Sequence, residues 1–557
     1  MEKVMMNPIQ KCNRDYYVNK LFDCIKGHPY ITFVHTFLFI CLFQTFSSFY
    51  GVDVADTGYF LTGYDQVLEA PESVMQTMGF YLTNVLGGGI LKLFPNIGFW
   101  GFRIIGVILL DFTFMMIFWM LRNEIPIIHI LLGCLLIVLG QAKFPCFFCA
   151  GLLTCSLYAI FLLLLYRGLS NNNKVLIFIS GIVAGLNIFI RIPNVLAIGI
   201  IFLVLLNRWF IHGDRKCDWY FTIVFTSGIL VGCFFVFILI CLLGHQQLMI
   251  DTIANLVKSG NSGADGHSWS VLLTTQLFLY SQAIIFLCLF YTIFSIDSKI
   301  SRNKLLISSL FWGAASFAII YHVYLSSSFN PIWALCFSGC LIGLRKYSKI
   351  RFLSVLSLFM LLVEPLGSNS GYNQGCLPAI LAAPVASAFI INRNNILYVL
   401  VACLALGLQY FKQGCYGDDG KICDKNSLLD IPELAYMRTT KEKAEVINSS
   451  LPKLRYLITP KDTLIVCDAF PLMNYLTHTR PVNGQPWPAL NSSAFDLTTC
   501  KNPPKILIQK FEHISKPLRA TRGVPTGNQM LDSYMREHKY GIVYENSFFI
   551  LLFPYHK

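Results

Sequence analysis

Five carboxylates gather in the stretch "GVDVADTGYFLTGYDQVLEAPESV", residues 51–74, which contains no Lys or Arg. They are Asp53, Asp56, Asp65, Glu69 and Glu72. Asp53 and Asp56 are three residues apart, so a helix would place them on one face, and a turn could also let them converge. Carboxylates held beside apolar walls can act as general bases or bind a divalent metal ion. An incidental accumulation of acids is equally compatible with their position.

The sequence around this stretch is that of a membrane protein. The chain has 557 residues, of which 55% are hydrophobic and only 13% are charged, with a mean hydropathy of +0.58. These values are too apolar for a soluble protein of this size. The net charge of +13 comes mostly from Lys and Arg in short connectors, where the positive-inside rule places them. We therefore expect membrane lipids, and no nucleic acid, as partners.

Apolar windows of suitable length predict an α-helical polytopic membrane protein with about 13 transmembrane helices. They begin near residues 30, 98, 126, 147, 175, 194, 219, 271, 305, 331, 352, 375 and 396. Connectors that this count places inside all carry Lys or Arg, and those outside are poorer in both. We predict a cytoplasmic N-terminus, a retained signal anchor at 30–50 and a first outer loop at 51–97. Within that loop, residues 73–94 read as two short interfacial helices interrupted by glycines 87–89.

The C-terminal part of the chain differs from the rest in its sequence pattern. Residues 412–557 contain amphipathic and β-like stretches, such as "DTLIVCD" and "FFILLFP", which predict a small extracytoplasmic α/β domain. The chain is thus divided into a transmembrane module, 1–411, and this domain, 412–557. Cysteines in an oxidising space are compatible with one or two disulfides, whose pairing the sequence leaves open. These cysteines are Cys415, Cys423, Cys467 and Cys500.

This layout resembles the GT-C superfamily of membrane glycosyltransferases, which use polyprenyl-phosphate sugar donors. It is similar to that of the aminoarabinose transferases and the protein O-mannosyltransferases. The stretch "ADTGYFL" looks like the superfamily's Asp-Glu-Gly-Tyr pattern, with Asp56 as the first acid. Thr57 stands where many members have the second acid, and Asp53 could supply that charge instead. The resemblance covers most of the chain in topology and rests on this one short motif.

The resemblance implies transfer of a sugar from a polyprenyl-phosphate donor to an extracytoplasmic acceptor, which could be a glycan, a lipid or a protein. Asp56 would act as the general base beside Asp53, and the reaction would usually invert the anomeric centre. Cations would bind the departing phosphate. The candidates for this role are Lys92, Arg191, Arg103 and Lys143. Arg103 and Arg191 could equally reach lipid headgroups. A divalent metal is conceivable and no cofactor is certain.

The candidates for sugar or acceptor contact lie in two outer loops and in the motif itself. Glu364, Asn369 and Tyr372 belong to "EPLGSNSGYNQG", whose side chains offer hydrogen bonds suited to a sugar. Tyr59 belongs to "ADTGYFL", and His267 to the outer loop 244–270. That loop could be a lid over the site, and ordinary loop flexibility explains its composition equally well.

Two other classes of function compete with this interpretation. A transporter or flippase of lipid-linked sugars would pair charges along several spans and often repeat one half of the chain in the other. Asp111 is nearly alone at membrane depth, and the halves do not match. A polysaccharide polymerase or ligase would more often place its catalytic residues in a large late outer loop.

We expect a multi-pass protein of a bacterial inner membrane, with the endoplasmic reticulum as the alternative.

Overall fold

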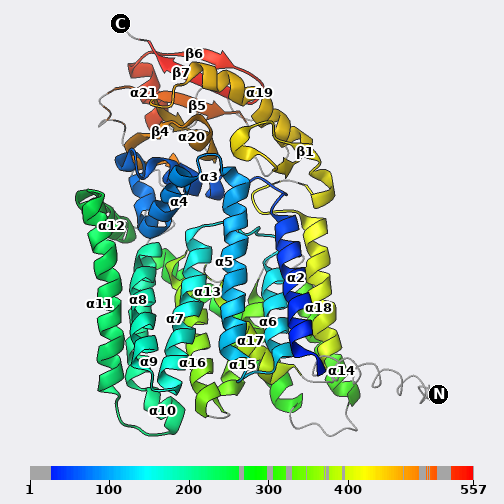
Figure 1. Ribbon diagram of the computed structural model, residues 1–557. Coiled ribbons are helices and arrows are strands. Elements are labelled where there is room, and N and C mark those ends of the chain that lie inside the picture. Colours follow the sequence, from blue (N-terminus) through cyan, green and yellow to red (C-terminus); the bar gives the residue numbers. More distant parts are fainter. Residues whose placement is uncertain are drawn as a thin grey trace, which may run out of the picture.

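The computed structural model describes most of the chain between residues 27 and 555. The residues left out within that range are 263–268, 298–304, 322–328, 346–347, 369–370, 372–374, 392–394, 419, 468, 489–496, 498–499, 501 and 511–528. A bundle of helices stands side by side below a cap, which the first outer loop and a β-sheet build together (Figure 1).

Every apolar window expected from the sequence coincides with a helical segment. These are α2 (Pro29–Ser47), α5 (Gly98–Leu121), α6 (Ile127–Gly140), α7 (Ala150–Ser170), α8 (Lys174–Ile190), η2 (Ile192–Gly199) with α9 (Ile200–Leu205), α11 (Trp219–Leu242), α13 (Trp269–Asp297), α14 (Leu305–Tyr321), α15 (Asn330–Leu344), α16 (Ser348–Val363), α17 (Ala382–Ile390) and α18 (Ile396–Gln413). Among the described residues, five helices are long and apolar enough to cross a membrane, namely α2, α5, α7, α11 and α13. The remaining helices are shorter, so the count of about 13 spans stays a prediction.

Small residues allow a close helix contact in the bundle. Gly181 and Gly185 of α8 face Gly228 and Gly232 of α11, and a Cβ on any of them would collide with the backbone of the other helix. Both pairs have the four-residue spacing that lets helix backbones approach closely in lipid, where apolar burial does not drive association. The short connector helix α10 (Asn207–His212) lies near the end of the bundle opposite the cap (Figure 1).

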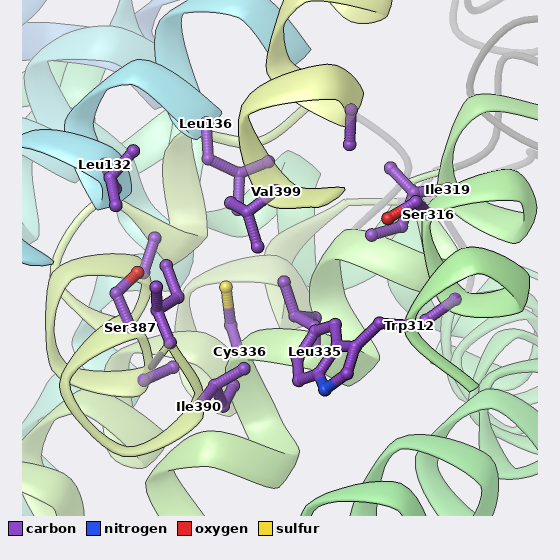
Figure 2. Close-up of a pocket in the computed structure, with 15 residues that line it drawn as sticks. Leu132, Leu136, Trp312, Ser316, Ile319, Leu335, Cys336, Ser387, Ile390 and Val399 are labelled. Carbon is purple, nitrogen blue, oxygen red and sulfur yellow. The ribbon is translucent and has the colours of Figure 1, made fainter. Parts of the chain in front are cut away.

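An apolar cavity lies inside the bundle between α6, α14, α15, α17 and α18 (Figure 2). Its lining is nearly all hydrocarbon, with Ser316, Ser387, Cys336 and the indole of Trp312 as its polar or polarisable members. No Asp, Glu, Lys, Arg or His belongs to this lining. The cavity therefore offers no carboxylate or imidazole as a general base and no cation to pair with a phosphate.

The first outer loop folds into three short helical segments. α3 (Asp56–Gln66) begins at the acid motif, and η1 (Pro71–Phe80) and α4 (Tyr81–Leu93) follow. The expectation of short helices instead of a crossing is met, but the break falls after Phe80 and not at the glycines. Gly87 and Gly88 lie within α4, where a Cβ on Gly87 would overlap the ring of Tyr64. These glycines let α4 pack directly against α3.

The outer loop 244–270 contains a helix in its described part. α12 (Gln246–Ser262) packs against η1, where the side-chain amide of Asn255 approaches the sulfur of Met75 at 4.0 Å. Met249 and Thr252 are buried, whereas Ile250, Ile253 and Val257 are exposed. A role for this loop as a lid stays a prediction.

The tail forms an α/β fold, as the sequence predicts. Its five-stranded sheet has the order β4-β3-β5-β7-β6, in which β3 is parallel to β4 and β5, and the other neighbours are antiparallel. The strands are β3 (Thr463–Val466), β4 (Arg480–Pro481), β5 (Lys505–Gln509), β6 (Tyr540–Glu545) and β7 (Phe549–Pro554). The helices are α19 (Lys441–Leu457), α20 (Leu472–Thr477) and α21 (Gln529–Glu537), and β1 (Ser427–Leu428) pairs with β2 (Arg438–Thr439).

The tail and the first outer loop share one hydrophobic core. Val54 and Leu61 of the loop belong to the same buried cluster as Leu472 and Phe549 of the tail. The N–H of Leu472 donates to the Val54 carbonyl at 3.1 Å, and the N–H of Gly51 donates to the Arg438 carbonyl at 2.8 Å. The α/β domain therefore packs around a cluster shared with the loop as well as around a cluster of its own residues. The domain division at residue 412 stays a prediction.

The four tail cysteines carry free thiols, so the disulfides that the sequence allowed are not formed. Cys415 is buried at the end of α18, where its thiol donates to the Tyr50 carbonyl at 3.2 Å. Cys423 is exposed and lies against Asp424, with its sulfur 3.6 Å from the carboxylate. The two thiols thus lie in different surroundings despite their closeness in sequence.

Candidate active site

Asp53 caps the first turn of α3 with both of its carboxylate oxygens. Its Oδ1 accepts from the N–H of Ala55 at 3.0 Å, and its Oδ2 accepts from the N–H and the hydroxyl of Thr57 at 2.8 and 3.0 Å. Asp53 is 5% exposed. A capping carboxylate stabilises a helix start because it satisfies free N–H groups and faces the positive end of the helix dipole. Asp53 thus supplies charge near the motif, while both of its oxygens are occupied.

Asp56 is the first residue of α3, and the residue is open to solvent on one side while the surrounding protein covers the rest. Its Oδ2 accepts a hydrogen bond from the hydroxyl of Tyr416 at 2.8 Å. Its Oδ1 has no hydrogen-bond donor among the residues that the structure describes. Burial by the surrounding protein and the negative charge of Asp53 raise the pKa of Asp56 to about 6, although the Tyr416 hydrogen bond opposes the rise. Asp56 therefore has one free oxygen and a pKa near that of an effective base at neutral pH.

Tyr416 comes from the beginning of the tail, three residues after α18 ends at Gln413. Its ring stacks on Phe144, with 4.8 Å between ring centroids, and its N–H donates to the Lys143 carbonyl at 2.7 Å. Tyr416 thereby joins the turn after α6 to the start of α3. Sequence reasoning missed this residue, although the Gly- and Asp-rich "GCYGDDG" directly after the last apolar window marks a tight turn there.

A buried ion cluster fixes the segment that carries Tyr416. The Asp418 carboxylate lies 2.6 Å from the Lys443 ammonium and 3.0 Å from that of Lys425. It also accepts from the N–H of Val52 at 3.1 Å. Burial acts to raise the pKa of Asp418, but the two lysines outweigh it and hold that pKa below its usual value. Asp418 thus ties the tail to the residue that precedes Asp53.

The guanidinium of Arg103 binds backbone carbonyls through one of its nitrogens. Arg103 is 2% exposed, and its Nη1 donates to the carbonyls of Ser48 and Tyr50 at 3.1 and 2.7 Å. The guanidinium also lies 4.9 Å from the ring centroid of Phe99. Arg103 binds the carbonyl groups where the chain leaves α2. Its expected contact with a phosphate or a lipid headgroup stays a prediction.

Arg191 and Glu364, which we assigned to phosphate and to sugar, pair with each other. Arg191 Nη2 lies 3.1 Å from Glu364 Oε1 and donates to the Glu364 carbonyl at 2.5 Å. Its Nε donates to Asn194 Oδ1 at 3.4 Å. Both members of the pair are buried. The pair joins the turn after α8 to η5 (Glu364–Gly367). A role of either residue in phosphate or sugar binding stays a prediction.

Two of the proposed phosphate-binding cations lie in different surroundings. Lys92 is exposed in the last turn of α4 and makes no ion pair with any residue described in the structure. Lys143 is half-buried beside Phe144, and burial lowers its pKa.

Tyr59 is buried one turn after Asp56. Asn369, Tyr372 and His267 lie outside the described residues.

The carboxylates here do not form a metal-ion site on their own. In the described ranges, no group of three His, Cys, Asp or Glu side chains lies close enough to hold a metal ion. Both oxygens of Asp53 accept hydrogen bonds at the first turn of α3. Asp56 is therefore the carboxylate of this pair that has an oxygen without a described hydrogen-bond donor.

Neither a protein-family model nor a curated protein sequence matches the chain. Its structure is similar to that of ArnT from Cupriavidus metallidurans bound to undecaprenyl phosphate, with a TM-score of 0.50 and 9% identity over 94% of this chain and 98% of that chain. An oligosaccharyltransferase from Archaeoglobus fulgidus tethered to an acceptor peptide also matches, with a TM-score of 0.38 and 12% identity over 82% of this chain and 64% of that chain. The likeness to ArnT confirms the GT-C-like polytopic fold.

Proposed function

We propose that this protein is a membrane glycosyltransferase that moves a sugar from a polyprenyl-phosphate donor to an extracytoplasmic acceptor, with Asp56 as the general base. The observation that carries the proposal is the Asp56 carboxylate, which has one oxygen held by Tyr416 and the other without a described partner. Its setting in a fold shared with ArnT, whose structure holds undecaprenyl phosphate, supports the choice of donor class.

The chemistry needs one base and one anion-binding group. An acceptor hydroxyl or amine attacks the anomeric carbon, the bond from that carbon to the phosphate oxygen breaks, and the sugar is transferred with inversion. Asp56 takes the proton that the acceptor loses. With a pKa of about 6 it is ionised at neutral pH and basic enough to be effective.

We assign the departing lipid phosphate to Lys92. Arg103 and Arg191 are buried on protein oxygens, whereas Lys92 is exposed at the end of α4. The next residues, Leu93 and Phe94, are 75% and 62% exposed, as expected for a helix end at an apolar surface. A cation beside exposed apolar side chains suits a phosphate that is carried on a lipid.

A transfer assay tests the proposal directly. The purified protein in lipid nanodiscs is supplied with undecaprenyl-phosphate sugars and with lipid, glycan and peptide acceptors. We expect Asp56→Asn to lower kcat/KM about 10²-fold or more, the usual contribution of a positioned base. The matched control is Asp251→Asn, since Asp251 is an exposed carboxylate on α12 whose one hydrogen-bond donor among the described residues is Gln247.

Two results would overturn this assignment. Folded Asp56→Asn protein with full transfer activity would remove Asp56 from the chemistry. Movement of the lipid-linked sugar across proteoliposomes without transfer to any acceptor would support a flippase instead.

A further inference from the structure

We propose that Tyr416 is a positioning residue that holds Asp56 Oδ2, so that Oδ1 is the oxygen left to receive the acceptor's proton. This inference rests on the proposed function of Asp56. It makes the first residues of the tail part of the active site, which would otherwise be built from the first outer loop and the bundle alone.

The phenol of Tyr416 is held in place from more than one side. Its ring stacks on Phe144 at 4.8 Å, its N–H donates to the Lys143 carbonyl at 2.7 Å, and its hydroxyl reaches Asp56 Oδ2 at 2.8 Å. Because the phenol of Tyr416 is already fixed, its hydrogen bond to the Asp56 carboxylate costs little conformational entropy. Asp56 is therefore oriented before any substrate binds.

The backbones that carry the two residues are held together as well. The Lys443 ammonium donates to the Val52 carbonyl at 3.1 Å and to the Gly417 carbonyl at 3.0 Å. Val52 precedes Asp53, and Gly417 follows Tyr416. Gly417 has a φ of +68°, and a Cβ there would lie 2.5 Å from Asp53 Oδ1. The approach of the tail to the acid motif thus depends on glycine at this position.

The contact also affects when Asp56 is ionised. Among the described residues, the titratable groups that interact electrostatically with Asp56 are Asp53 and Tyr59 from its own segment, Cys149 at the start of α7, and Tyr416. Asp53 disfavours a second negative charge, whereas a phenol that donates to the carboxylate favours the charged form. Loss of the Tyr416 hydroxyl should therefore raise the pKa of Asp56.

Tyr416→Phe isolates this contribution because it keeps the ring that stacks on Phe144 and the backbone N–H. In the transfer assay, we expect the acid limb of kcat/KM to move to higher pH by about 1 unit, in line with the strength of a hydrogen bond to a charged group. Activity should recover at higher pH. The control is Tyr456→Phe, since Tyr456 is 82% exposed and its hydroxyl donates no hydrogen bond to a carboxylate among the described residues. A Tyr416→Phe profile that is unshifted on the pH axis overturns the inference.

A second measurement does not depend on transfer activity. Carbodiimides activate protonated carboxyl groups, so labelling of Asp56 against pH, read by mass spectrometry of its peptide, reports its protonation. We expect the midpoint to rise in Tyr416→Phe and to fall when 3-fluorotyrosine, a stronger donor of nearly the same size, replaces Tyr416. The fluorinated protein answers the question even if Tyr416→Phe fails to fold.

The two measurements separate the inference from the proposed function. Shifted labelling midpoints in a protein that transfers no sugar support the contact and refute the function. Unshifted midpoints, together with loss of transfer in Asp56→Asn, support the function and refute the role of Tyr416.

Discussion

Two neighbouring carboxylates at the start of α3 differ in their partners, and the difference predicts different effects of substitution. Asparagine also caps helices well, so Asp53→Asn should leave α3 folded while removing a negative charge beside Asp56. The charge of Asp53 raises the pKa of Asp56, so its loss should lower that pKa. We expect Asp53→Asn to keep transfer activity, with the acid limb of kcat/KM at lower pH than in the unaltered protein.

The pH–rate profiles of Asp53→Asn and Asp56→Asn check this division of roles. If Asp53→Asn lost as much activity as Asp56→Asn at every pH, Asp53 would take part in the proton transfer itself. Asp53→Ala is a useful companion, because loss of the cap should cost about 1 kcal/mol of stability without testing the charge alone.

The sequence predicted the acid pair but not the partners that distinguish its members. Tyr416 lies 360 residues from Asp56, and Glu364 lies 173 residues from Arg191, so no local pattern connects them. Arg103 and Arg191 stood out as cations on the side where charge bias disfavours them. The cost of burying a cation explains why the fold gives each of them protein oxygens as partners.

At the scale of elements, the length of the apolar windows predicted the helices correctly. The glycine run 87–89 predicted a helix break that the structure does not have there. The windows coincide with helices because a lipid-facing segment must satisfy its backbone internally. Gly87 to Gly89 looked like an interruption because glycine weakens helices. In the structure they lie within α4, where the absence of a side chain at Gly87 gives room for Tyr64. This close contact between helices is not visible in the sequence of α4 alone.

This contact predicts opposite effects for two glycines of the same helix. A Cβ on Gly87 would overlap the Tyr64 ring, whereas a Cβ on Gly89 would meet nothing within 4 Å. We expect Gly87→Ala to lower stability by about 1–3 kcal/mol, as overpacking does, and to reduce transfer by displacing α3. Gly89→Ala should be neutral or stabilising because alanine favours helices. Thermal unfolding in detergent measures both, and equal effects would contradict the packing.

A histidine clasp joins α3 to the tail and predicts a pH dependence of stability. His478 Nδ1 lies 3.1 Å from Asp65 Oδ1, and Nε2 lies 3.6 Å from Glu433 Oε1, which also binds Arg455 at 2.7 Å. The hydrogen bonds to Asp65 and Glu433 raise the pKa of His478 from 6.5 to about 9. A raised pKa means that the stabilisation is fully present below about pH 6.5 and is lost as the pH rises through 9.

Comparison of melting temperatures at pH 7 and pH 10 tests this clasp. We expect the unaltered protein to lose more stability over this interval than His478→Gln, by about 1 kcal/mol or less because the side chain is partly exposed. His538→Gln serves as the control, since His538 lies in the tail on the Tyr534 carbonyl and no carboxylate pairs with it in the described structure. Equal pH dependence in His478→Gln and the unaltered protein would show that the clasp contributes nothing.

At the scale of the whole molecule, the opening loop and the tail form one unit above the bundle (Figure 1). The alternating patterns of the tail predicted its α/β class, because strands and helices have distinct periods. They could not predict where the tail docks, since Leu472 and Val54 meet only after the chain has crossed the bundle. The acid motif and Tyr416 consequently come from distant parts of the chain and act at one place.

This arrangement makes membrane orientation testable with two exposed cysteines. Cys423 lies in the tail, on the same side as Asp56, and Cys217 lies in the connector between α10 and α11 at the other end of the bundle. Charge bias predicts that this end of the bundle is cytoplasmic, because the connector carries Arg215 and Lys216 and α10 carries Arg208. The acceptor would then meet Asp56 outside the cytoplasm.

Variants that keep only one of these cysteines can be treated with a membrane-impermeant maleimide in intact cells. We expect label on Cys423 in intact cells and on Cys217 only after the membrane is permeabilised, because a charged reagent does not cross the bilayer. A variant without cysteines reports background labelling. The reverse pattern would place Asp56 and the tail in the cytoplasm, where transfer to an extracytoplasmic acceptor could not take place.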